Sequence, residues 1–185
     1  HHLLRRQRQM CIRDSGYSVQ RGSKVFISLK DIYENVIEHK LYIVHRLDKD
    51  TSGLMLFAKN RITASKISSL FLNNQIKKFY ISVTNNKFNK NTDTLTNYNS
   101  DKKELKLVYR KIQLGNHENC YLIKLFTGKK HQIRLQFYLN KNPIIGDKKF
   151  SGNKFNKLLL CSYKIIFKLD EKFYKFKINP NKILS

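Results

Sequence analysis

HRLDKDTSGLMLFAKN, residues 45–60, is a polar and charged stretch held between two apolar runs. The run LYIV at residues 41–44 is typical of a short buried strand, and GLMLFA at residues 53–58 predicts a second one. A charged loop that joins two buried strands carries its side chains on rigid walls at the mouth of a core. By residue type alone, the loop is either a polar hairpin turn with an incidental Arg–Asp pair or a functional site.

The chain is strongly basic and of single-domain size. Its 185 residues are enough for one compact domain but not comfortably for two, and 41% of them are hydrophobic. The formal net charge of +24 exceeds what solubility requires, and it predicts a polyanionic partner, above all nucleic acid. An anionic membrane surface is the weaker alternative, because no basic amphipathic helix stands out and no apolar run is long enough to span a bilayer.

Signatures of metal, redox and nucleotide chemistry are missing from the sequence. Cys11, Cys120 and Cys161 are odd in number and far apart, which argues against a disulfide framework, a zinc site or a redox motif. Their pattern fits a reducing cytoplasm best. There is no Gly-rich phosphate loop and no His-Glu-x-x-His motif. We therefore expect a cytoplasmic protein without a metal, nucleotide or redox cofactor.

The loop sequence HRLDKDTSGLMLFAK resembles the signature loop of the RluA-type pseudouridine synthases. In that family the loop reads His-Arg-Leu-Asp, two variable residues, Thr-Ser-Gly, and an apolar strand that ends Ala-Lys. The motif is long and mostly non-degenerate, so chance matches are rare. The resemblance implies that Asp48 is the catalytic residue and that Arg46 acts at the nucleotide that is flipped out of its stack.

Two later stretches resemble further motifs of this family. KKFYISV at residues 77–83 is similar to Lys-x-Tyr-x-Ala-x-Val, which places Tyr80 against the target base. TGKKHQIRLQFYLNKNPIIGDKKFSG at residues 127–152 is similar to Thr-Gly-Arg-Thr-His-Gln-Ile-Arg, a helix, and His-Pro-Ile-x-Gly-Asp. Lys129, Lys130 and Asn142 depart from this pattern, but they leave the catalytic set intact. Taken alone, Tyr80 would be read as a core or cross-strand tyrosine.

Arg134 is the residue of the third motif that we expect to act at the site. It is one of only four Arg after residue 21, where Lys meets most other needs for positive charge. Its planar fork can hold a carboxylate at two points, so we infer that Arg134 pairs with Asp48. Without the motif, the default interpretation would be a surface arginine on a helix.

The reaction that the resemblance implies needs one ionised carboxylate beside the ribose. Asp48 could attack covalently or take a proton from the sugar, and the sequence does not decide between the two. A neighbouring Arg would oppose the rise in the pKa of Asp48 that burial causes. We expect His45 and His131 to be structural, holding the loop and the helix start, because the chemistry requires no histidine.

Residues 1–15, HHLLRRQRQMCIRDS, differ in composition from the rest of the chain. Residues 1–13 contain four Arg and no Lys, whereas the remaining residues contain 28 Lys and five Arg. The segment is either a basic, disordered arm that binds nucleic acid or a non-native segment. We favour the second, since RRQRQMCIRDS looks like translated sequencing-adapter read-through. The family match starts at Gly16, so we expect residues 16–185 to form a catalytic domain whose first strand is missing.

Local patterns predict the remaining elements. A strand at residues 24–28 precedes a helix that Ser28 caps and that ends near residue 39, with Ile32, Val36 and Ile37 on one apolar face. A second helix follows Asn60 and has Ile62, Ile67, Leu70 and Phe71 on its apolar side. Strands are predicted at residues 76–84, 104–114, 119–126, 158–169 and 173–178, a helix at residues 131–140, and a loop at residues 85–103.

We predict an α+β pseudouridine synthase fold, a bent, mixed but mainly antiparallel sheet flanked by helices. The expected function is isomerisation of uridine to pseudouridine in RNA, with large-subunit ribosomal RNA as the expected substrate. We expect RNA as the partner, no membrane or metal, and a monomer. The alternative is a non-catalytic RNA-binding module of the same fold, and a ribosomal structural protein is the weaker third candidate.

Overall fold

The structure is a computed structural model that describes the backbone of residues 9–13 and, in full, residues 28–184. The elements are β1 (Gln9–Arg13), α1 (Leu29–Ile37), β2 (Tyr42–Ile43), β3 (Ser52–Ala58), α2 (Arg61–Leu72), β4 (Lys77–Val83), β5 (Thr92–Tyr98), β6 (Glu104–Leu114), β7 (His117–Leu125), α3 (Gln132–Leu139), β8 (Leu160–Leu169), β9 (Lys172–Lys177) and α4 (Asn181–Leu184). No helix among the described residues is both long enough and apolar enough to cross a membrane.

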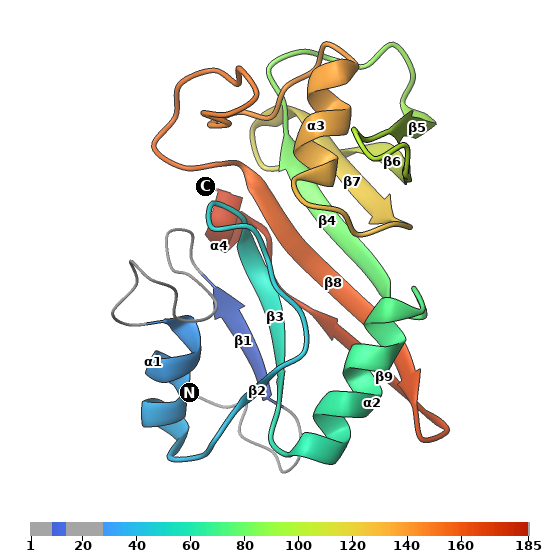
Figure 1. Ribbon diagram of the computed structural model, residues 1–185. Helices are drawn as coiled ribbons and strands as arrows, with labels where there is room; N and C mark the ends of the chain where they lie inside the picture. Colours follow the sequence, from blue (N-terminus) through green and yellow to red (C-terminus); the bar gives the residue numbers. More distant parts are fainter. Residues whose placement is uncertain (1–8, 14–27, 185) are drawn as a thin grey trace.

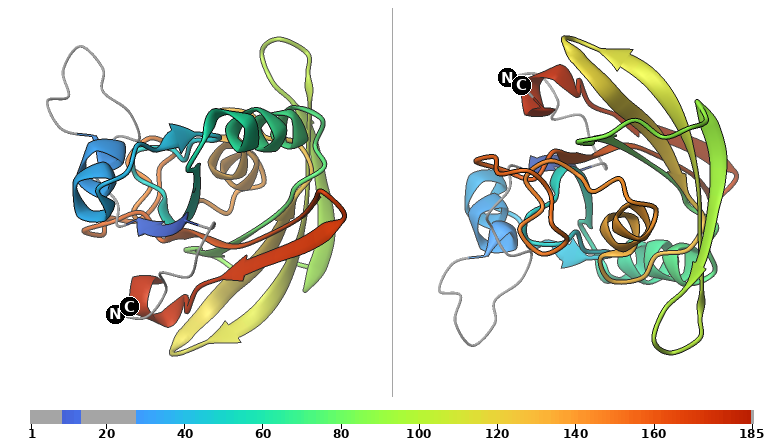
Figure 2. Two further views of the ribbon diagram at one scale, coloured as in Figure 1. Left: turned by 90° about the horizontal axis from the view of Figure 1, so that it is seen from below. Right: turned by 90° about the horizontal axis from the view of Figure 1, so that it is seen from above.

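The described strands form one mixed sheet with mainly antiparallel pairing (Figure 1). The strand order is β1-β3-β8-β4-β7-β6-β5, while β2 pairs with β3 and β9 pairs with β8. Only β3 and β8 run parallel. The helices α2 and α3 lie together on one side of the curved sheet (Figure 2). This arrangement confirms the predicted α+β class and the mixed, mainly antiparallel sheet flanked by helices.

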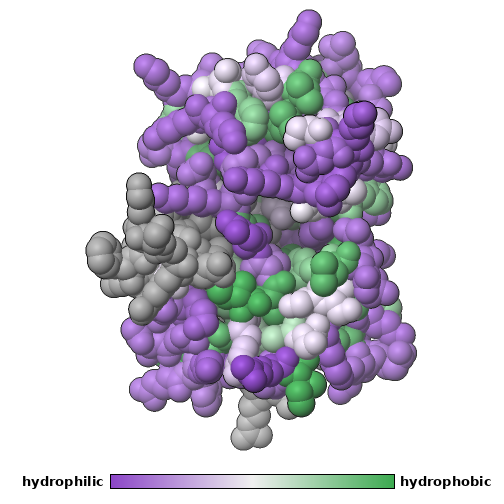
Figure 3. All heavy atoms as spheres, in the orientation of Figure 1, coloured by the Kyte–Doolittle hydropathy of each residue, from purple (hydrophilic) through white to green (hydrophobic). Residues whose placement is uncertain are grey.

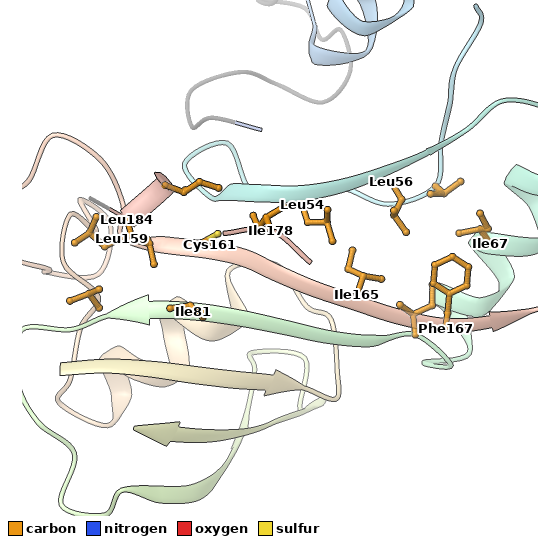
Figure 4. Close-up of a cluster of buried hydrophobic side chains, with 14 of the residues drawn as sticks. Leu54, Leu56, Ile67, Ile81, Leu159, Cys161, Ile165, Phe167, Ile178 and Leu184 are labelled. Atoms are coloured by element: carbon orange, nitrogen blue, oxygen red, sulfur yellow. The ribbon is translucent and has the colours of Figure 1, made fainter. Parts of the chain in front are cut away.

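Two clusters of buried side chains stabilise the two halves of the sheet. The first includes Leu54, Leu56, Ile67, Ile165 and Phe167, and it packs β3, β8 and α2 together (Figure 4). The second is rich in aromatic rings that meet edge to face under α3, and these are Phe88, Tyr109, Tyr121 and Phe137. Strands β4 and β8 contribute residues to both clusters, so they join the two halves of the core.

Gly53 allows β3 and β8 to approach closely enough to pair. It has a φ of +108°, and a Cβ atom there would lie 2.4 Å from the backbone oxygen of Ser162 on β8. Only glycine fits a position with both a positive φ and such close backbone contact. The glycine that follows Thr-Ser in the loop motif therefore fixes where the loop enters the sheet.

The first two helices begin at the predicted caps, and Ile37 of α1 and Ile67, Leu70 and Phe71 of α2 pack against the core as predicted. Ser28 caps α1 in a capping box with Asp31, and the side chain of Asn60 accepts a hydrogen bond from the backbone of Thr63 at the start of α2. The buried side of α1 is formed by Leu29, Tyr33 and Ile37. Val36 and Ile62, which we expected on apolar faces, are each 73% exposed.

Two further predictions about elements are corrected by the structure. The segment 85–103 was predicted to be a loop, but it contains β5, which pairs with β6 along its whole length. Residues 1–15 were predicted to lie outside the domain, but the backbone of residues 9–13 pairs with residues 53–57 of β3. The origin of that segment stays a prediction. The strand predicted at residues 24–28 lies outside the described residues, apart from Ser28.

Candidate active site

A cavity of about 470 Å³ lies where the charged loop, α2, β4 and the start of α3 meet. Its volume is in the range of roughly 300–1,000 Å³ that is usual for ligand pockets. On the face shown in Figure 3, a hollow lies between the part with α3, where hydrophilic residues border it, and the part with α2, where hydrophobic residues are also exposed near it. All four predicted site residues, Arg46, Asp48, Tyr80 and Arg134, line this cavity.

Asp48 lies in the loop between β2 and β3, and its carboxylate faces His131. Oδ2 of Asp48 is 2.9 Å from Nδ1 of His131, and the two side chains are only 25% and 19% exposed. Because an ionised carboxylate has no proton to donate, we assign the proton to Nδ1, which donates to Asp48. His131 was expected only to hold the start of the helix, but it also contacts the predicted catalytic residue.

The backbone at His131 is in the left-handed region, with φ 55° and ψ 21°. This conformation is uncommon for a residue other than glycine, although histidine adopts it more readily than most. The side chain makes no capping hydrogen bond to α3, so helix capping does not account for the conformation. Backbone strain of this kind is often concentrated at functional sites, and here it accompanies the contact with Asp48.

Arg134 pairs with Asp147, and not with Asp48 as we inferred from the sequence. Its Nε and Nη2 donate to the two carboxylate oxygens of Asp147, each at 2.8 Å, and both side chains are buried. Its third nitrogen, Nη1, is 3.5 Å from Oδ2 of Asp50 and 3.3 Å from Nδ1 of His131. Since that ring nitrogen already carries a proton, the contact with His131 is not a hydrogen bond.

The carboxylate of Asp147, and not that of Asp48, binds the guanidinium group of Arg134, because backbone hydrogen bonds already hold it in place. Oδ1 of Asp147 also accepts hydrogen bonds from the backbone N–H groups of Lys149 and Phe150, both at 3.0 Å. Burial alone raises the pKa of Asp147, but the hydrogen bonds and charge of Arg134 lower it below its ordinary value. Arg134 is therefore held by Asp147 and not by Asp48.

Lys78 and Tyr80 face the cavity from β4, since residues two apart on a strand share a face. Burial and the nearby charge of Asp48 raise the pKa of Tyr80, so its phenol stays neutral. Lys78 is only 9% exposed, and burial lowers the pKa of its ammonium group. Its Nζ lies 3.0 Å from where a Cβ would stand on Gly128, so that glycine leaves room for Lys78.

His45 and Arg46, the first two residues of the loop motif, also line the cavity. Nε2 of His45 accepts the backbone N–H of Leu56 at 2.9 Å, and its ring stacks on Phe71 with centroids 4.5 Å apart. Burial and the charge of Lys78 lower the pKa of His45 to about 3, so the ring is neutral. These contacts are the structural ones that we predicted. Arg46 is exposed at the cavity wall.

The residues that the sequence analysis did not assign to the site are His131, Lys78 and Asp147. Lys78 could have been found from the alternation of a strand, because it lies two residues before Tyr80. Asp147 is within the third motif, but nothing in the sequence says which carboxylate Arg134 meets. Across the described part of the chain, no group of three or more His, Cys, Asp or Glu is placed to hold a metal ion.

Comparisons by sequence match the chain to one family. The model of the RNA pseudouridylate synthase family matches residues 14–138. An uncharacterized RNA pseudouridine synthase of Mycoplasma capricolum is 36% identical over 165 residues, which are 78% of this chain and 54% of that protein. Ribosomal large subunit pseudouridine synthase C of Rickettsia prowazekii is 34% identical over 155 residues, covering 74% of this chain and 51% of that protein. The chain thus spans about half the length of the curated relatives it matches.

Solved structures share the same fold at low sequence identity. Human RNA Pseudouridylate Synthase Domain Containing 4 superposes with a TM-score of 0.76 at 18% identity, covering 94% of this chain and 85% of that one. Human RNA Pseudouridylate Synthase Domain Containing 1 gives a TM-score of 0.78 at 16% identity, covering 96% and 81%. Because the family model matches most of this chain, the chain belongs to the RNA pseudouridylate synthases, as a member of the RluA type.

Proposed function

We propose that this protein isomerises uridine to pseudouridine in RNA, with Asp48 as the catalytic residue. The observation that carries the proposal is the placement of Asp48 in a cavity beside Tyr80 and Arg134, with its carboxylate oriented by His131. A single, oriented carboxylate in a partly enclosed site can act as a nucleophile or as a general base. Family membership supports the same activity.

The isomerisation exchanges one bond to the ribose for another. The bond between N1 of uracil and C1′ of the ribose breaks, the base turns, and C5 bonds to C1′. The proton that C5 loses is balanced by the proton that N1 gains, so no oxidant or reductant is consumed. Asp48 would either bond to the sugar for the duration of the turn or take a proton from it, and both routes require its ionised form.

The neighbours of Asp48 would hold the nucleotide in a productive position. Tyr80 offers an aromatic face on which uracil can stack, and its neutral phenol leaves the charge at the site to Asp48. Arg46, exposed at the cavity wall, could fill the gap that the flipped base leaves in its stack. The proton that His131 donates would hold the carboxylate of Asp48 in position for the reaction.

Large-subunit ribosomal RNA is the substrate that we propose. Several relatives from Rickettsia are named as ribosomal large subunit pseudouridine synthase C. The net charge of +24 fits a substrate that carries one phosphate for every nucleotide.

Pseudouridine mapping of total RNA tests the substrate. RNA from cells that lack this protein, and RNA from the same cells after its gene is restored, should differ at one or a few uridines of large-subunit ribosomal RNA. The Asp48→Asn variant, expressed to the same level, is the matched control and should restore none of them. Identical maps with and without the protein would contradict the proposal, as would modification confined to transfer RNA.

A further inference from the structure

One face of the sheet carries lysine and aromatic side chains that the site does not use. On β4, Lys78 and Tyr80 face the cavity, so Lys77 and Phe79 face the opposite side. Phe79 is registered with Lys164 of β8 and with Lys124 of β7, and Lys164 is registered with Lys177 of β9. We name this surface the basic face, and its residues are Lys77, Phe79, Lys124, Lys164, Phe173, Lys175 and Lys177.

The lysines of the basic face have no carboxylate partners within the described part of the chain. Lys164 and Lys177 stand directly opposite each other, an arrangement of like charges that destabilises a strand pair. Burial and the charges of Lys175 and Lys177 lower the pKa of Lys164. The carboxylates of the adjacent β8–β9 turn pair with lysines outside this set, Asp170 with Lys66 and Glu171 with Lys168 beside Phe173. The positive charge of this face is therefore left uncompensated.

Aromatic rings lie among these lysines and are partly open to solvent. Phe173 is 78% exposed on β9, although the inner side of that strand packs Tyr174 against Phe167 with centroids 5.2 Å apart. Nζ of Lys164 is 4.2 Å from the ring centroid of Phe79. A surface that combines ammonium groups with open aromatic faces is typical of proteins that bind single-stranded nucleic acid, where bases stack and phosphates pair with cations.

We propose that the basic face binds a second segment of RNA, outside the nucleotide that enters the cavity. This inference rests on the proposed function for the identity of the RNA, but not for its chemistry. Lys77 and Lys78 are neighbours on β4 that face opposite sides of the sheet, so one RNA could contact both sides by passing around the edge strand β9. The occupant is single-stranded RNA, held through its phosphates and by stacking on Phe173.

The test compares two triple variants that lose the same charge. The basic-face variant is Lys164→Gln with Lys175→Gln and Lys177→Gln, and the matched control is Lys87→Gln with Lys102→Gln and Lys103→Gln, all exposed lysines near β5. Both are made in the Asp48→Asn background, so binding is measured without turnover. The two probes are a short uridine-containing hairpin and the same hairpin with single-stranded flanks.

The basic-face variant should bind the flanked RNA about tenfold more weakly at low salt. Its slope of log affinity against log salt should fall in magnitude by about 2, or roughly 0.7 for each lost phosphate contact. The control and the hairpin alone should change far less. An equal loss in both variants would overturn the proposal, as would an equal loss for both RNAs. Weaker binding of the basic-face variant to phosphatidylserine vesicles, with unchanged binding to the flanked RNA, would also overturn it, because the face would then bind a membrane.

Two further measurements, of melting temperature and of isomerisation, distinguish a loss of RNA binding from a loss of folding or of catalysis. Removing lysines that repel each other should leave the melting temperature unchanged or higher. If the triple variant fails to fold, the double variant Lys175→Gln with Lys177→Gln on the edge strand β9 carries the same test. If the basic-face variant that folds, triple or double, binds the flanked RNA as tightly as the parent does, the proposal is overturned. Isomerisation by the parent chain is assayed separately, so its absence would refute the proposed function while the binding comparison still decides the basic face.

Discussion

Arg134 shows that the type of a residue can be predicted more easily than its partner. Replacing it by lysine keeps the charge but removes the two-pronged contact with Asp147. Removing one partner of a buried ion pair costs about 3–5 kcal/mol, and a lysine should recover only part of this. We expect Arg134→Lys to lower the free energy of unfolding measured with urea by at least about 1 kcal/mol, and to reduce turnover.

The control for this prediction is Lys87→Arg, a change at an exposed position. The partner is identified by comparing Asp147→Asn with Asp48→Asn. Only the first should lower the free energy of unfolding to the extent that Arg134→Lys does. Equal stability of Arg134→Lys and the control would show that the pair contributes nothing, and a large loss in Asp48→Asn alone would favour the pair inferred from sequence.

His45 predicts a pH dependence of stability. Burial depresses its pKa to about 3 in the folded chain, against an ordinary value near 6.5 in the unfolded chain. Below pH 6.5 the unfolded chain therefore binds a proton that the folded chain does not, so this contribution to stability is present above that pH and is lost as the pH falls. Its slope approaches about 1.4 kcal/mol per pH unit between pH 6 and pH 3.

Urea unfolding of the parent and of His45→Gln at several pH values measures this slope. Glutamine retains an acceptor for the backbone of Leu56 but does not titrate, so the variant should lose less stability between pH 7 and pH 4 than the parent does. The same substitution at the exposed His39 is the matched control. Parallel curves for His45→Gln and the parent would mean that His45 titrates alike in both states.

At the scale of elements, His131 at the start of α3 combines a left-handed backbone conformation with a contact to the proposed catalytic residue Asp48. Asparagine tolerates the left-handed conformation but lacks the ring nitrogen that donates to Asp48, whereas a β-branched valine loses both properties. We expect His131→Asn to reduce turnover with a nearly unchanged melting temperature. His131→Val should lower both, with a stability loss of about 1–2 kcal/mol. Full turnover in His131→Asn would remove His131 from the site.

The pairing of β1 with β3 changes what deletion of the N-terminal segment should do. We expected residues 1–15 to be dispensable, but loss of residues 9–13 would leave backbone groups along one edge of the buried strand β3 without partners. Deleting residues 1–8 should therefore leave the melting temperature unchanged, and deleting residues 1–15 should lower it. If both deletions are silent, the segment contributes nothing to the fold, as its composition first indicated.

Elements with a strong local signal were predicted well, and those determined by distant contacts were not. The strand β6 begins and ends where its alternation predicted, and α2 begins after the predicted cap Asn60. The strand β5 has little apolar alternation, since only Leu95 is buried along it, and it forms because β6 offers an edge. The same holds at the site, where the motifs placed Asp48 and Arg134 together but Asp147 decided their pairing.

On the scale of the whole molecule, the sheet separates two basic regions of different character. On one side, Arg46, Lys78 and Arg134 surround a cavity with a carboxylate at its wall. On the other, the basic face carries lysines without carboxylate partners in the described residues. A cavity suits one nucleotide, whereas an open basic sheet suits a run of phosphates. We therefore propose that the cationic groups of the cavity serve the reaction and that those of the basic face serve RNA affinity.

Tritium release from uridine-labelled ribosomal RNA tests the central claim most directly. The hydrogen at C5 of uracil leaves only if C5 becomes bonded to the ribose. The parent chain should release tritium, and Asp48→Asn should release none while binding the RNA within a few-fold of the parent, because the substitution keeps size but removes the charge. Release by Asp48→Asn at the parent's rate would contradict the assignment of Asp48, and no release by the parent would contradict the proposed activity.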